Sequence, residues 1–168
     1  IFTTSVYVKQ NTNTWVGVSL IGKSGTINTC YFNTTNGSMG TCTANTYGSS
    51  TPEANGFYRL SARASLSTGA SIVKLRIYLA NGDNSLTWTG DGEKSVYVWG
   101  GHMNFGPILT EYLKTTTDSA AQPRIESGGY FSESTRTNFL QWSRDLSKSV
   151  WTKSNVTVSK TATGHDGV

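Results

Sequence analysis

The chain has 168 residues, of which 36% are hydrophobic and 14% are charged, and its formal net charge is +4. This length is enough for one domain with a sizeable core, and no apolar run reaches the roughly 18 residues that a membrane span requires. The 14 basic residues are scattered along the chain rather than clustered. We therefore expect neither membrane insertion nor nucleic acid as a partner.

The residue pattern predicts strands for most of the first hundred residues. Apolar and polar side chains alternate with period two, and clusters of Gly, Asn, Ser and Asp separate the alternating runs. The predicted strands are, in chain order, 2–10, 14–21, 28–33, 38–43, 56–66, 71–80 and 94–103. In the last of these, Val96 and Val98 point toward the core and Tyr97 and Trp99 point away from it. Together the strands predict an all-β, antiparallel two-sheet sandwich of the jelly-roll type.

The two cysteines, Cys30 and Cys42, flank a turn built on Asn36 and Gly37. A three-residue hairpin loop would place the cysteines opposite each other and allow a disulfide bond, which an oxidising compartment would preserve. A two-residue loop would shift the register by one and leave two free thiols. Because no histidine lies near them in the sequence, the cysteines do not predict a zinc site.

The character of the chain changes after Pro107. We expect the sandwich module to span residues 1–112, without its N-terminal part, and a linker rich in Thr, Ser and Ala to span 113–137. Residues 138–168 are interpreted as the beginning of a second, similar module, with a short helical turn near 144–149 and a strand at 155–160. About thirty residues cannot bury a core of their own. They must therefore pack on the first module, on a continuation of the chain or on a neighbouring chain.

Several short motifs carry a resemblance to a known type of module. They are SVYVK at 5–9, GFYR at 56–59, TGDG at 89–92 before VYVWGG at 96–101, and ILTEYL at 108–113. In this order they resemble a bacteriophage tail or fibre module of the concanavalin-like, carbohydrate-binding jelly-roll type. Segments 133–140 and 151–158 resemble the opening of the same module. The resemblance implies a non-catalytic virion protein that contacts other virion subunits and forms a homotrimer. One departure concerns residues 100–104, which read GGHMN where the family usually has GAQLE, so no role of that Gln or Glu carries over.

The sequence contains no recognisable catalytic arrangement. His102 and His165 have no serine or cysteine nucleophile placed by a known motif, and Asp91 and Glu93 share one turn rather than facing each other across a cleft. The acidic turns at 81–84 and 90–93 offer oxygen ligands that suit calcium, but their Asn, Gly and Asp residues are typical of tight turns. We therefore predict no enzyme activity, no metal site and no cofactor.

Carbohydrate binding is the function that the outward-facing residues favour. Sugars stack an apolar face on aromatic rings, while guanidinium groups bind their hydroxyls. If the strands share one sheet, the candidate residues form a single aromatic and basic face that would bind a host surface glycan. The candidates are Tyr7, Arg59, Arg76, Tyr78, Trp88, Tyr97 and Trp99, with Trp15 as a further aromatic at a strand end. In the alternative interpretation, these aromatics bury against a linker, a loop or another subunit, and the chain is a purely structural fibre or decoration module. A secreted bacterial carbohydrate-binding module is a third alternative.

Overall fold

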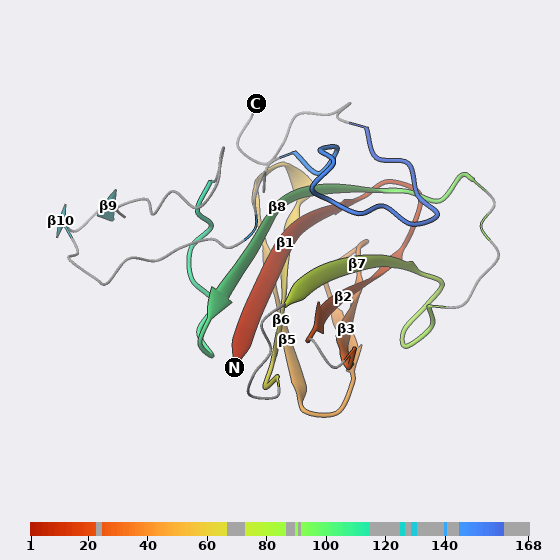
Figure 1. Ribbon diagram of the computed structural model, residues 1–168. Coiled ribbons are helices and arrows are strands. Elements are labelled where there is room, and N and C mark those ends of the chain that lie inside the picture. The colour runs from red at the N-terminus through yellow and green to blue at the C-terminus, as the bar shows by residue number, and fades with distance from the viewer. Residues whose placement is uncertain are drawn as a thin grey trace.

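The computed structural model describes residues 1–22, 25–66, 73–86, 90, 92–114, 125–126, 129–130, 140 and 145–159. Strands dominate the described part of the chain, which Figure 1 shows as a ribbon. The elements are β1 Phe2–Gln10, β2 Trp15–Ile21, β3 Ile27–Asn33, β4 Met39–Cys42, β5 Thr46–Pro52, η1 Ala54–Gly56, β6 Tyr58–Ala64, β7 Lys74–Ala80, β8 Val96–Phe105, β9 Ile125–Glu126 and β10 Gly129–Tyr130.

Eight of these strands form two four-stranded antiparallel sheets. Sheet A has the order β5-β6-β1-β8, and sheet B has the order β4-β3-β2-β7. The long strands β1 and β8 lie side by side in sheet A, while β7 pairs with β2 in sheet B (Figure 1). The short strands β9 and β10 pair with each other in a separate ladder. The predicted all-β, antiparallel two-sheet sandwich is therefore confirmed.

The core lies between the two sheets, where alternate side chains of each strand point inward. The side chains of its central cluster are at most 1% exposed. The cluster consists of Val6, Val8, Val16, Val18, Cys30, Phe32, Leu60 and Ala62. Val96 and Val98 pack against this cluster, which confirms their assignment to the core. Each fully buried aliphatic side chain of this kind contributes roughly 1.5–3 kcal/mol to folding. The side chains between them point outward and form the two outer faces of the sandwich.

One strand of sheet A was not expected from the sequence. Strand β5 pairs with β6 along its whole length at the edge of the sheet. Its sequence, TYGSSTP, contains one large apolar side chain, Tyr47, so no alternation of apolar and polar residues marks it. Backbone hydrogen bonds to β6 therefore define this strand, and a pattern based on hydrophobicity does not detect it.

The β3–β4 hairpin places Cys30 opposite Cys42, and the two residues form a disulfide bond. Of the two registers considered, the structure has the one in which the cysteines face each other. In the turn, Gly37 has a φ of +72°, and a Cβ at this position would lie 2.3 Å from the ring of Tyr58. Only glycine fits there. The disulfide thus ties the short edge strand β4 to the rest of sheet B.

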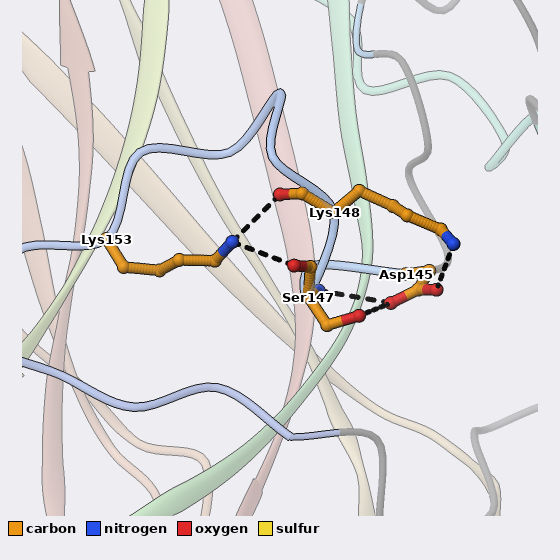
Figure 2. A network of polar contacts seen from close by, with 4 residues as sticks. All are labelled: Asp145, Ser147, Lys148 and Lys153. Atoms are coloured by element: carbon orange, nitrogen blue, oxygen red, sulfur yellow. Dashed lines mark hydrogen bonds and ion pairs between the residues drawn. The ribbon is translucent and has the colours of Figure 1, made fainter.

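Residues 146–151 form turns and bends, and residues 152–159 are irregular, with no strand. The strand predicted at 155–160 is wrong for 155–159, and Lys160 lies outside the described residues. Figure 2 shows that the Asp145 carboxylate accepts hydrogen bonds from the backbone and hydroxyl of Ser147 and lies 3.6 Å from Lys148 Nζ. Lys153 Nζ donates to the carbonyls of Ser147 and Lys148 at 2.8 and 2.9 Å. Polar contacts between neighbouring residues therefore hold this segment in turns.

Two described residues of the C-terminal part of the chain, Leu140 and Trp151, pack on the sandwich where β8 and β7 approach each other; the described residues 145–159 are drawn in blue in Figure 1. A Cβ at Gly101 would lie 3.2 Å from the Trp151 ring and 3.5 Å from both Leu140 and Leu75. Leu140 also packs against the part of the core that contains Met103. Packing on the first module was one of the three arrangements considered, and the described residues adopt it. The division into a linker at 113–137 and a second module at 138–168 stays a prediction.

Candidate binding face

The structure does not bring the predicted carbohydrate-binding residues together on one face. Four of them lie on the outer face of sheet A, namely Tyr7 on β1, Arg59 on β6, and Tyr97 and Trp99 on β8. Arg76 and Tyr78 lie on the outer face of sheet B, because β7 pairs with β2 rather than with a strand of sheet A. Trp88 lies outside the described residues. The expectation of a single aromatic and basic face is therefore wrong.

On sheet A, the segment that follows β8 folds back over the outer face (Figure 1). We call residues 106–112 the strap. Arg59 Nη2 donates to the Thr110 carbonyl at 2.6 Å, and His102 Nε2 shares a 2.7 Å hydrogen bond with Thr110 Oγ1. Asn104 Nδ2 donates to the Ile108 carbonyl at 3.0 Å. Thr3 Oγ1 of β1 donates to the Gly106 carbonyl at 2.7 Å, and Arg63 Nη1 of β6 donates to the Pro107 carbonyl at 3.2 Å. Side chains from three strands of sheet A thus hold the strap.

The strap buries most of the predicted aromatic surface of sheet A. Tyr112 packs its ring against Tyr7 and Trp99, with centroid distances of 5.9 and 4.8 Å, and Tyr7 and Trp99 are 5.0 Å apart. Tyr7 is 5% exposed and Trp99 is 8% exposed. Tyr97 packs against this cluster and is half-buried. Because their rings are covered by the chain itself, Tyr7 and Trp99 offer no stacking surface to a sugar in this structure, which corrects their assignment to a binding site.

Burial under the strap also sets the charge state of His102. Burial, reinforced by the Arg59 guanidinium, lowers the pKa of His102 from 6.5 to about 3. The imidazole is therefore neutral at neutral pH, and its Nε2 is occupied by Thr110. Burial lowers the pKa of Arg59 as well, but an arginine stays protonated under ordinary conditions. Both groups hold the strap through Thr110.

On sheet B, two tyrosines flank a glycine on the outer face. Gly17 of β2 pairs with Tyr31 of β3 on one side and with Tyr78 of β7 on the other. A Cβ at Gly17 would lie 3.3 Å from Leu86 Cδ2 and 3.6 Å from Tyr78 Cβ. Leu86 therefore fills the depression above the glycine. Tyr31 is 5% exposed, whereas Tyr78, at the edge of the sheet, is half-buried.

Polar groups surround the accessible part of this face. Arg76 is exposed; its Nη1 donates to the Tyr78 hydroxyl at 2.9 Å, and its guanidinium carbon lies 5.7 Å from the centre of the Tyr78 ring. Asp83 accepts hydrogen bonds from the backbone N–H and the hydroxyl of Thr41, at 2.7 and 2.9 Å. Burial raises the pKa of the Tyr31 hydroxyl, and the nearby Asp83 and Tyr78 raise it further by charge repulsion. The outer face of sheet B therefore carries the Arg76 guanidinium beside Tyr78 on β7, and the Asp83 carboxylate toward β4.

Two residues of this face were not identified as binding candidates from the sequence. Tyr31 alternates with the core residues Cys30 and Phe32, a signal that its side chain points outward. Asp83 was considered only as part of an acidic turn. A Cβ at Gly40 would lie 2.3 Å from Asp83 Oδ1 and 2.8 Å from the Trp15 ring. Trp15 and Asp83 are thus neighbours above β4, an arrangement between distant segments that no local motif reveals.

The acidic turns show no metal-binding cluster in the described part of the chain. Within that part, no group of three or more His, Cys, Asp or Glu side chains is arranged to hold a metal ion. The Asp83 carboxylate is engaged by Thr41, whereas Asp91 lies outside the described residues. No helix among the described residues is long and apolar enough to cross a bilayer.

Comparisons with known proteins find no relative. No family model, no curated protein and no solved structure matches the chain. The function proposed below therefore rests on the geometry of the two outer faces and on the sequence motifs.

Proposed function

We propose that this chain is a non-catalytic module that binds carbohydrate through the outer face of sheet B. The fibre-like motifs of the sequence favour a bacteriophage tail fibre or similar virion appendage as its setting, with a host surface glycan as the ligand. The Cys30–Cys42 disulfide supports an oxidising, extracellular location. No nucleophile, acid–base pair or metal is required for this function.

The observation that carries the proposal is the arrangement around Tyr78. Its ring supplies apolar surface at the edge of sheet B, and the Arg76 guanidinium lies beside it. The Tyr78 hydroxyl and the Asp83 carboxylate supply hydrogen-bonding groups for sugar hydroxyls. A small number of polar groups around aromatic surface is the usual composition of a ligand site. Sheet A offers no such combination near Tyr7, because the strap covers it.

A glycan array with the full chain tests the proposal. We expect specific glycan binding by the wild type and a loss of at least about tenfold in Tyr78→Ala, since a central aromatic contact is worth 2 kcal/mol or more. Tyr47→Ala is the matched control, because Tyr47 is 60% exposed and also has an arginine, Arg63, 4.9 Å from its ring, but on sheet A. Melting temperatures verify that both variants fold. If Tyr47→Ala lost glycan binding and Tyr78→Ala did not, the glycan would bind on sheet A, and the proposal of a site on sheet B would be wrong.

A second candidate function is a purely structural module of a virion fibre. The burial of Tyr7 and Trp99 under the strap favours it, because this aromatic surface is used for packing within the chain. A structural module predicts an array with no specific hits together with a trimer that persists on dilution in sedimentation experiments. Specific hits that depend on Tyr78 would decide for the binding module.

A further inference from the structure

Strand β7 presents a row of two cations and an aromatic ring on the outer face of sheet B. Lys74, Arg76 and Tyr78 alternate with core-facing residues, so all three lie on the outer face. Alternate residues of a strand are about 7 Å apart, which places both cations within reach of one short oligosaccharide. Lys74 and Arg76 are both exposed.

Among the residues that the structure describes, no carboxylate neutralises either cation. The Arg76 guanidinium donates a hydrogen bond to the Tyr78 hydroxyl and lies beside its ring. The carboxylate near this face, Asp83, lies on the β4 side and is engaged by Thr41. The charge on the face is therefore polarised, with positive charge along β7 and negative charge toward β4.

We propose that the ligand of this face is an acidic glycan whose carboxylate groups lie against Arg76 and Lys74; this inference rests on the proposed carbohydrate-binding function. Arginine has five N–H donors in a planar fork, and Nη1 uses one of them on Tyr78. The remaining donors match the two oxygens of a carboxylate. The Tyr78 ring then contacts the apolar side of the adjoining sugar, and Lys74 binds the next acidic group as a point charge.

Single-stranded nucleic acid also binds to aromatic rings beside cations. A nucleic-acid groove, however, follows the backbone with many basic residues, and this row has two. The proposal therefore commits to a glycan, and nucleic acid is an outcome of the test.

The test is calorimetric titration of the full chain with oligogalacturonate, neutral dextran oligosaccharides and an oligothymidylate. We expect oligogalacturonate to bind most tightly and its affinity to fall as salt rises, because exposed charges are screened. Arg76→Gln should lose about tenfold or more, since a hydrogen bond to a charged group is worth about 1.5–3 kcal/mol. Arg76→Lys should lose less, and Lys74→Gln less than Arg76→Gln. Arg63→Gln, an exposed arginine on sheet A, is the matched control and should bind like the wild type.

The results distinguish the inference of an acidic ligand from the proposed carbohydrate-binding function on which it rests. Dextran binding that equals oligogalacturonate binding and is unaffected by Arg76→Gln would overturn the acidic ligand and leave carbohydrate binding in place. Preference for oligothymidylate, or no binding of any glycan here and on the array, would overturn both. An equal loss in Arg63→Gln and Arg76→Gln would show a general charge effect and reject the assignment to β7.

Discussion

Among the residues described by the structure, three tyrosine–arginine pairs lie on the outer faces of the sandwich, and the chain covers one of them. Tyr7 and Arg59 on sheet A are covered, whereas Tyr78 and Arg76 on sheet B, like Tyr47 and Arg63 at the β5 edge of sheet A, are accessible. On sheet A, the Arg59 guanidinium lies 5.6 Å from the centre of the Tyr7 ring, and the strap lies over both. On sheet B, the Arg76 guanidinium lies 5.7 Å from the centre of the Tyr78 ring, and Arg76 is exposed. The local chemistry of the two pairs is the same. Segments outside the strands decide which pair is available to a ligand.

The strap closes sheet A because its polar groups find partners there. The carbonyl of Thr110 is bound by Arg59 and its hydroxyl by His102, while Tyr112 covers the aromatic rings. In the segment after β7, Leu86 covers Gly17 and Asp83 binds Thr41 on sheet B, and both leave Arg76 exposed. A face whose rings are buried and whose covering segment is held by hydrogen bonds is part of the core in energetic terms.

The largest effect predicted from this comparison concerns the two aromatic residues. Trp99→Ala removes a buried ring and should lower the free energy of unfolding by about 3–5 kcal/mol. Tyr78→Ala changes a half-buried residue at the sheet edge and should lower it by about 1 kcal/mol or less. Urea unfolding at pH 7, followed by circular dichroism, measures both. Equal losses in the two variants would contradict the distinction between a closed face and an accessible face.

The sequence was sufficient to predict the sandwich, because alternation in β1, β2, β6, β7 and β8 is strong and reflects burial of every second residue. It also identified which residues point outward, Tyr7 and Trp99 as well as Tyr78. It was not sufficient to predict which sheet each strand joins or what covers an outer face, since both depend on contacts between segments far apart in the chain. Arg59 and Thr110, for example, are 51 residues apart in the sequence.

The second prediction concerns the pH dependence of the closed face. The pKa of His102 is about 3 in the folded protein and 6.5 in the reference state, so between these values the unfolded chain binds more protons. The contribution of the buried, neutral His102 to the free energy of unfolding is fully present above pH 6.5 and decreases as the pH falls toward 3. Between pH 7 and pH 5 the free energy of unfolding should fall by about 2 kcal/mol. Urea unfolding at pH 7, 6 and 5 measures this loss. His102→Gln does not titrate and should lose about 2 kcal/mol less over the same range; an identical loss in both proteins would show that other groups are responsible.

The smallest of these effects concerns a single hydroxyl of the strap. Thr110→Val keeps the shape of the side chain but leaves Nε2 of the buried His102 without its partner, which should lower the free energy of unfolding by about 1–2 kcal/mol. Thr51→Val, at an exposed position of β5 in the same sheet, is the matched control and should change it by less than about 0.5 kcal/mol. Glycan binding should be the same in both variants, because the strap lies on sheet A and the proposed site on sheet B. If Thr110→Val weakened glycan binding without unfolding the chain, the binding face would include the strap, and the two faces would not be separate in function.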